Sequence, residues 1–269
     1  ALAAAERGLV TFRHRHRVDE LVIANGSVTG VRGGAILAPD DARAAPPSNR
    51  ERLGDFEFAA QAVIVTTGGI GGNHEIVRRY WPQRMGTPPA SMITGVPAYV
   101  DGRMLDIAAD SGVRLVNRDR MWHYTEGVQN WDPIWPGHAI RILPGGPSSM
   151  WFDALGRRLP EPYLPGYDTL GTLRYLRTTP EIAGYDHSWF ILTQKIIERE
   201  FALSGSEQNP DITSKDRAGF LKERLLSKGA PAPVEAFKRN GADFVVADGL
   251  DELVAKMNAL TDEPLLDAG

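Results

Sequence analysis

Two runs that contain β-forming apolar residues flank an Asn-Gly pair near the start of the chain. The first run is His16 to Ala24, the second is Ser27 to Val31, and Asn25-Gly26 separates them. Both residues of a two-residue hairpin turn take positive φ, which asparagine and glycine adopt most readily. The pattern therefore predicts an antiparallel hairpin, and the alternation from Phe56 to Ala60 predicts a third strand of the same ribbon.

A continuous apolar run, Ala62 to Thr66, has the pattern of a strand buried on both faces of a sheet. It leads into Thr67 to Asn73, where four of five consecutive residues are glycine. Glycines let the backbone turn sharply and approach a ligand, and Asn73 is a good cap for a following helix. The segment therefore predicts a strand, a turn and a helix, and the turn suits a phosphate or an aromatic ring system. The alternative is a tight connection without a ligand.

Other segments have weaker patterns. A helix tail ending at Gly8, a short strand at Leu9 to Phe12 and a long surface excursion from Gly33 to Asp55 are expected. Apolar residues at helical spacing predict further helices, the last with Asp248 as its cap. These helices span Arg103 to Ser111, Ser188 to Leu203, Ser214 to Leu226, Val234 to Asn240 and Leu250 to Leu260.

Composition narrows the function. The 269 residues hold no cysteine, so redox chemistry needs an organic cofactor, and we expect no metal site. A net charge of −4 argues against a nucleic-acid partner, and no apolar run is long enough to span a membrane. We therefore expect a cytoplasmic protein that acts on a small-molecule substrate.

Three segments of the first part resemble the FAD-binding domain of the succinate dehydrogenase/fumarate reductase flavoprotein family. His16 to Val31 resembles the ribbon of that domain, and Ala62 to Asn73 resembles the strand and turn that follow it. Val100 to Met104 resembles the family's Gly-Asp-Gly helix start, with Val100 in place of the first glycine.

The resemblance continues into the second part. Asp153 to Leu159 resembles an Asn-x-x-Gly-Lys-Arg-Phe hairpin of the substrate domain, and Phe244 to Ala259 resembles a short helix there. Within the family, the chain is most similar to the branch that resembles 3-ketosteroid dehydrogenases.

This resemblance implies FAD as cofactor. It places Val18 beside the adenine, and it places a larger set near the flavin: Thr67, Gly68, Gly69, Asn73, Asp101 and Gly102. The chain holds no G-x-G-x-x-G motif and lacks the family's glycine-rich flavin segment. We therefore expect the chain by itself to lack FAD and to self-associate or pair with the family's remaining segments.

On the substrate side, the resemblance places Met121 to Glu126 where fumarate reductases bind substrate. His123 and Tyr124 are the candidate catalytic residues, since either could donate a hydrogen bond to a carbonyl oxygen. The alternative is that both pack at a domain boundary. Arg141 aligns with a family arginine, although a surface ion pair is the simpler role.

The choice of substrate depends on charge. Fumarate reductases carry a proton-donating arginine where this chain has Tyr163 to Thr169, which contains none. A dicarboxylate needs cationic partners, so an apolar substrate fits better. The aromatic residues nearby suit such a substrate but also suit a core: Trp122, Trp131, Trp135, Trp151 and Tyr163.

The predicted fold is α/β. Residues 1–120 would form part of an FAD-binding domain, with a parallel strand and an antiparallel ribbon, and residues 121–269 an α+β substrate (cap) domain. The predicted function is that of a fragment of an FAD-dependent oxidoreductase acting on a C–C bond next to a carbonyl. The alternatives are a catalytically silent, partner-binding fragment and a fumarate-reductase-like enzyme acting on a dicarboxylate.

Overall fold

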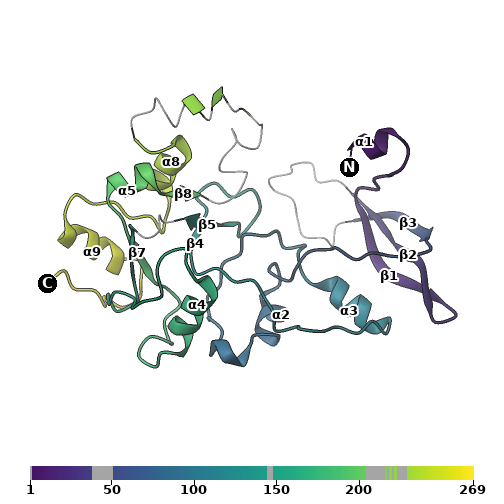
Figure 1. The fold of residues 1–269 in the computed structure, drawn as a ribbon, viewed down its shortest axis with the longest axis horizontal. Helices are drawn as coiled ribbons and strands as arrows, with labels where there is room; N and C mark the ends of the chain where they lie inside the picture. Colours follow the sequence, from purple (N-terminus) through teal and green to yellow (C-terminus); the bar gives the residue numbers. More distant parts are fainter. Residues whose placement is uncertain are drawn as a thin grey trace. The chain divides into compact units, whose positions relative to one another are not determined.

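The chain contains two compact units. The computed structural model describes residues 2–37, 51–143, 148–203, 216, 218–219, 221–222 and 229–269 (Figure 1). The first unit comprises residues 1–76 and 97–118, and the second comprises residues 77–96 and 119–269. The predicted boundary between residues 120 and 121 stays a prediction about folding domains.

The first unit contains a three-stranded antiparallel ribbon and a helix beside it (Figure 1). Its elements are α1 (Leu2–Glu6), β1 (His16–Ala24), β2 (Ser27–Ile36), β3 (Arg52–Ala59) and α3 (Arg103–Asp110). A short helix, α2 (His74–Arg79), spans the division between the units.

The Asn-Gly hairpin is confirmed. Ala24 of β1 pairs with Ser27 of β2, which leaves a two-residue turn. Asn25 has a φ of 52° and Gly26 a φ of 75°, as this turn requires. The third strand of the ribbon is also confirmed, because β3 pairs with β2 throughout its length.

Three predictions for the first unit are wrong in part or whole. Residues 33–36 and 52–55 extend β2 and β3, so the excursion from Gly33 to Asp55 is shorter than expected, and its middle lies outside the described residues. Leu9 to Phe12 forms no strand. Ala62 to Thr66 also forms no strand, and Ile64 is 86% exposed. A strand of this pattern needs neighbours on both sides, and no described residues pair with it.

The second unit contains short antiparallel strands and several helices. Its elements are η1 (Gln83–Met85), β4 (Gly127–Gln129), β5 (Ala139–Leu143), β6 (Met150–Phe152), α4 (Thr169–Thr178), β7 (Trp189–Ile191), α5 (Gln194–Arg199), β8 (Ala202–Leu203), α8 (Ala232–Asn240) and α9 (Leu250–Asn258). Strands β4, β5 and β8 form one sheet, and β6 pairs with β7. All named strands that pair do so antiparallel, so the described residues show mixed helices and antiparallel sheets.

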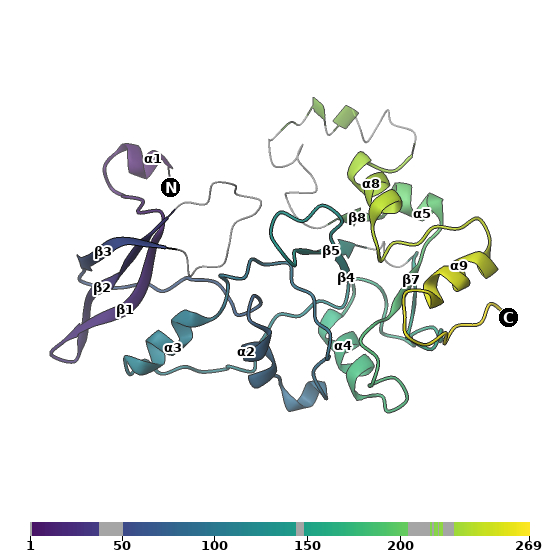
Figure 2. The same ribbon diagram turned by 180° about the vertical axis from the view of Figure 1, so that it is seen from behind.

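The core of the second unit lies where β5, β8, α5 and α8 meet. Figure 2 shows α8 beside α5 and β8. The buried side chains of this cluster are Ile140, Ile142, Ile197, Phe201, Leu203, Ala230, Val234 and Phe237. Because they come from these four elements and from the residues directly beside them, apolar burial joins the elements into one unit.

Of the helices predicted for the second unit, two are confirmed, one is wrong and one lies mostly outside the described residues. Helices α8 and α9 confirm the patterns at Val234 and Leu250, but Gly249 caps α9 and Asp248 does not. The predicted helix from Ser188 to Leu203 is replaced by β7, α5 and β8. Most of Ser214 to Leu226 lies outside the described residues.

Phe237 offers a direct test of this core. Its side chain is fully buried, so Phe237→Ala should lower the free energy of unfolding by about 3–5 kcal/mol. Leu250→Ala is the control, because Leu250 is 54% exposed and the same kind of truncation there should cost well under about 1 kcal/mol. Urea titration monitored by circular dichroism measures both. If both variants lost the same free energy of unfolding, Phe237 would not belong to the core.

Candidate functional site

The glycine-rich turn is held in place by backbone hydrogen bonds. The amide of Gly72 donates to the carbonyl of Val100 at 2.8 Å, and the amide of Asn73 donates to Ile70 at 2.9 Å. The Asn73 carboxamide oxygen accepts from the amides of Glu75 and Ile76, at 3.1 and 3.3 Å, and so caps α2 as predicted. The end of the turn at Gly72 and Asn73 is therefore fixed.

The glycines of this turn serve two purposes. Gly68 and Gly72 allow backbone geometry that other residues would strain, and Gly69 leaves the space beside the backbone empty. A Cβ at Gly72 would lie 2.5 Å from the carbonyl oxygen of Pro97, so only glycine allows this close approach. Gly68 has a φ of 87°. At Gly69, a Cβ would meet no atom within 4 Å, and residues 66–69 are exposed. The backbone at Gly69 is therefore open to a ligand.

The Asp101-Gly102 pair lies beside the turn. Gly102 has a φ of 75°, and a Cβ there would lie 2.7 Å from Cγ2 of Ile70. The Asp101 carboxylate accepts a hydrogen bond of 3.0 Å from the amide of Arg103, the first residue of α3. The structure thus brings two of the predicted cofactor motifs together, with the hydrogen bond from Gly72 to Val100 between them.

Val18 belongs to the same unit. It lies in β1 opposite Gly33, and its carbonyl accepts a hydrogen bond of 3.4 Å from Nη2 of Arg103. Arg103 follows Gly102 directly, so one side chain links the predicted adenine contact to the start of α3.

The two candidate catalytic residues have different surroundings in the second unit. His123 packs against Trp81, with ring centroids 4.8 Å apart, and its Nε2 is buried without a hydrogen-bond partner. Tyr124 is 47% exposed and lies beside Trp122. The guanidinium of Arg141 stacks over the Tyr124 ring at 4.1 Å. The structure therefore does not present the two side chains to one site.

Burial decides the charge of His123. Its pKa is lowered because removing the imidazole from water penalises the charged form. His123 is consequently the neutral species near pH 7, able to donate one hydrogen bond and accept another.

A buried carboxylate was missed by the sequence analysis. Glu126 is only 1% exposed and accepts a hydrogen bond of 3.3 Å from the hydroxyl of Thr169. Its Oε2 lies 4.0 Å from Nε of Arg141, and neither of these two atoms has a hydrogen-bond partner. Arg141 therefore has an ionic partner, but the prediction of a surface ion pair is wrong, because that partner is buried. A lone glutamate in a sequence gives no sign of such burial.

The aromatic residues divide between core and surface. Trp151 is buried and stacks on Phe190, whereas Trp122 is 82% exposed. Trp135 stacks on His138, and Tyr163 stacks on Tyr175 of α4. Trp122 lies beside Tyr124, in the same segment as the two candidate catalytic residues, and it presents an exposed apolar surface there.

A family model described as an FAD binding domain matches residues 1–269. The chain belongs to this FAD binding domain family. A KsdD-like steroid dehydrogenase of Mycobacterium tuberculosis (strain CDC 1551) is 56% identical over 262 residues, covering 97% of this chain and 45% of that protein. A KsdD-like steroid dehydrogenase of Mycolicibacterium smegmatis is 57% identical over 258 residues, covering 96% of this chain and 46% of that protein. The chain therefore spans about half the length of these curated relatives.

The residues of the glycine turn fit FAD. The open space at Gly69 would admit an aromatic ring or a phosphate, and the fixed turn presents its backbone to that space. The individual cofactor contacts stay predictions. In the described part of the chain, no helix is long and apolar enough to cross a membrane.

Gly69 tests the cofactor position without backbone strain, because its φ lies outside the left-handed region. Gly69→Val should lower FAD content at least about tenfold, since the added side chain occupies the open space that the cofactor needs. The matched control is Gly54→Val in β3, where a Cβ also meets no atom within 4 Å. Flavin released from the natural polypeptide, with any residues that flank this chain, measures both variants. Unchanged flavin in Gly69→Val would overturn the placement.

His123 predicts a pH dependence of stability. Its pKa is lowered in the folded chain, so the unfolded chain binds the proton first as pH falls below about 6.5. The free energy of unfolding should therefore decrease between pH 6.5 and the lower folded pKa, and the loss should be complete below the latter. His123→Gln should reduce this slope, while His187, whose pKa burial also lowers, supplies part of the remainder. An unchanged slope in urea titrations of His123→Gln would contradict the assignment.

Proposed function

We propose that this chain is part of an FAD-dependent dehydrogenase that acts on a C–C bond next to a carbonyl of a steroid-like, apolar substrate. The observation that carries the proposal is the open backbone of the glycine turn in a chain of the FAD binding domain family. The relatives are named steroid dehydrogenases, which supports the substrate class. The α/β arrangement with a separate cap domain belongs to the same proposal.

Bound FAD supplies an acceptor for hydride. The residues proposed to hold it are Val18, Thr67, Gly68, Gly69, Asn73, Asp101 and Gly102. Of these, Asn73 caps α2, and Asp101 accepts a hydrogen bond from the amide of Arg103, the first residue of α3. The contribution of this chain is thus a preformed surface for the cofactor.

On the substrate side, Tyr124 is the better candidate donor of the two predicted residues. Its side chain is exposed, whereas Nε2 of His123 is buried. A hydrogen bond from the Tyr124 hydroxyl to the carbonyl oxygen would stabilise the negative charge that develops there in the transition state. Arg141, stacked over the ring, holds Tyr124 in place and adds positive charge beside it.

The fumarate-reductase-like alternative is less well supported. Arg141 is the arginine stacked on Tyr124, and Glu126 already faces it. A second carboxylate group of a substrate would need another cation. Activity assays with an artificial electron acceptor separate the two functions, since the proposed enzyme oxidises a 3-ketosteroid and a fumarate-reductase-like enzyme consumes fumarate. Turnover of fumarate alone would overturn the steroid proposal.

Tyr124→Phe tests the donor role. The variant removes the hydroxyl and keeps the ring under Arg141, so kcat should fall about 10²–10⁴-fold with little change in stability. Tyr167→Phe is the matched control, because Tyr167 is 74% exposed in the same unit and its hydroxyl is assigned no role. Normal turnover by Tyr124→Phe would remove the residue from the mechanism without affecting the assignment of FAD.

The isolated 269-residue chain should contain no FAD and have no dehydrogenase activity. A dinucleotide pyrophosphate is usually bound where a G-x-G-x-x-G turn opens a helix, and the chain holds no such motif. Losing several charge-assisted hydrogen bonds of about 1.5–3 kcal/mol each weakens binding by orders of magnitude. The absorbance spectrum of the purified chain measures the flavin. Stoichiometric flavin would show that the turn at residues 67–73 binds far more tightly than expected.

A further inference from the structure

Asp19 occupies an irregular position in the ribbon. Val18 pairs with Gly33 and Glu20 pairs with Arg32, so Asp19 is an extra residue of β1 without a partner in β2. Such a β-bulge twists the strand and redirects the side chain of the extra residue. A Cβ at Gly33 would lie 1.9 Å from the carbonyl oxygen of Arg17, so glycine opposite the bulge allows the two strands to approach.

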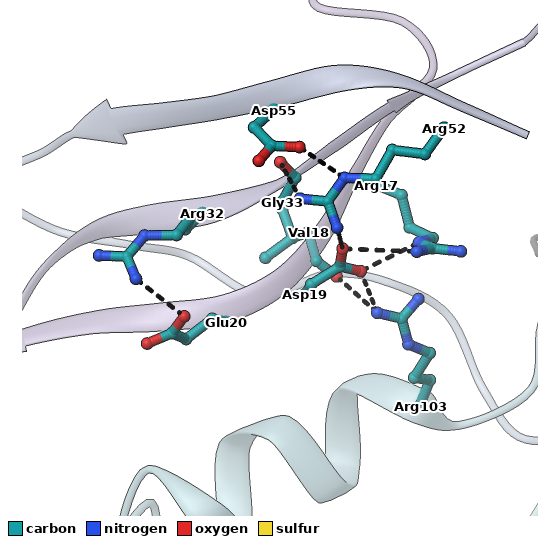
Figure 3. A network of polar contacts seen from close by, with 9 residues as sticks. All are labelled: Arg17, Val18, Asp19, Glu20, Arg32, Gly33, Arg52, Asp55 and Arg103. Carbon is teal, nitrogen blue, oxygen red and sulfur yellow. Dashed lines mark hydrogen bonds and ion pairs between the residues drawn. The ribbon is translucent and has the colours of Figure 1, made fainter.

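Three guanidinium groups from three separate elements converge on the Asp19 carboxylate (Figure 3). Nε of Arg17 in β1 donates to Oδ1 at 3.0 Å, and Nη1 of Arg52 in β3 lies 3.8 Å from Oδ2. Arg103 of α3 donates through Nη2 to Oδ1. The Asp19 side chain is 23% exposed. It is therefore the common anion of β1, β3 and α3.

Two of the three arginines, Arg52 and Arg103, are also held by other groups. Arg52 forms an ion pair of 2.7 Å with Asp55, and its Nη2 donates to the carbonyl of Gly33 at 3.4 Å. Nη2 of Arg103 also donates to the carbonyl of Val18. Burial tends to raise the pKa of Asp19, but hydrogen bonds from Arg103 and Arg17 outweigh it and hold the pKa below its ordinary value. Asp19 is thus ionised at neutral pH, as the three cations require.

The same network reaches the proposed cofactor contacts. Arg103 is the first residue of α3, and its own amide is bound to the Asp101 carboxylate. Its side chain therefore fixes the distance between the Asp101-Gly102 turn and the strand at Val18. The family resemblance assigned the flavin end of the cofactor to the turn and the adenine end to the strand.

We propose that Asp19 is a positioning residue of the FAD site, which holds Arg103 so that the Asp101-Gly102 turn and the Val18 strand keep the separation that the bound dinucleotide needs. The inference rests on the proposed function, because it takes Val18, Asp101 and Gly102 as cofactor contacts. Asp19 itself acts through Arg103 and does not touch the cofactor. Preorganised contacts bind more tightly because less ordering remains to be done on binding.

The experiment compares Asp19→Asn with Glu20→Gln in the natural polypeptide, with any residues that flank this chain. Asparagine keeps the size of the side chain and removes the charge that attracts three arginines. Glu20→Gln is the matched control, because Glu20 is the next residue of β1 and pairs with exposed Arg32 and not with Arg103 (Figure 3). FAD dissociation constants are measured by the fluorescence of added flavin, and the melting temperature is measured without flavin.

We expect Asp19→Asn to raise the FAD dissociation constant at least about tenfold and Glu20→Gln to change it less than about twofold. If Asp19 is a positioning residue, the melting temperatures of the two flavin-free variants should differ little. A purely structural role would instead lower the melting temperature of Asp19→Asn without a matching loss of FAD affinity. If Asp19→Asn binds FAD as the unaltered protein does, the positioning role is overturned and the proposed function stands. If the unaltered protein itself binds no FAD, the proposed function fails instead.

A second variant covers the case in which Asp19→Asn does not fold. Arg103→Lys keeps a cation at the start of α3 but cannot contact Asp19 and Val18 with the geometry of a guanidinium. Arg103→Lys should also raise the FAD dissociation constant. In the double variant Asp19→Asn/Arg103→Lys, the fold-increase in this constant should be smaller than the product of the two single fold-increases. Independent, multiplying losses would show that the two residues do not act together.

Discussion

The hydrogen bond from the amide of Gly72 to the carbonyl of Val100 is the contact on which the candidate cofactor site depends. It joins two turns that are almost thirty residues apart in the sequence. Only glycine at position 72 allows the approach, because a Cβ would collide with the carbonyl of Pro97. Asn73 then caps α2, and the Asp101 carboxylate accepts a hydrogen bond from the first amide of α3. Backbone geometry and side-chain caps together set one surface.

The two units differ in what holds them together. In the second unit, apolar side chains from α5, α8, β5 and β8 are buried in one cluster. The ribbon of the first unit is instead crossed by charged side chains, with Asp19 at their centre (Figure 3). Charge networks are directional and apolar packing is not. The proposed cofactor contacts therefore lie in the first unit, where directional ion pairs and hydrogen bonds cross the ribbon.

The sequence predicted features that local chemistry determines. The Asn25-Gly26 turn, the Asn73 cap and the start of α3 follow from the φ values and hydrogen bonds of a few adjacent residues. Ala62 to Thr66 was mispredicted because burial of a strand depends on neighbours distant in sequence. The environments of Asp19 and Glu126 were missed for the same reason, since a bulge register and a buried carboxylate are products of pairing and packing. Helix α4, capped by Asp168, was overlooked although its Asp-x-x-Gly start is a local signal.

The exposed run from Ala62 to Thr66 has a consequence for the behaviour of the chain in solution. Its residues are uncharged, mostly β-branched and free of proline, and Ile64 and Val65 point apolar surface to water. Segments of this composition pair readily with identical copies, strand against strand, in the manner of fibril cores. The nearest charged residue before it is Glu57 of β3. Pairing of two copies through this run would thus use residues that lie outside the buried core.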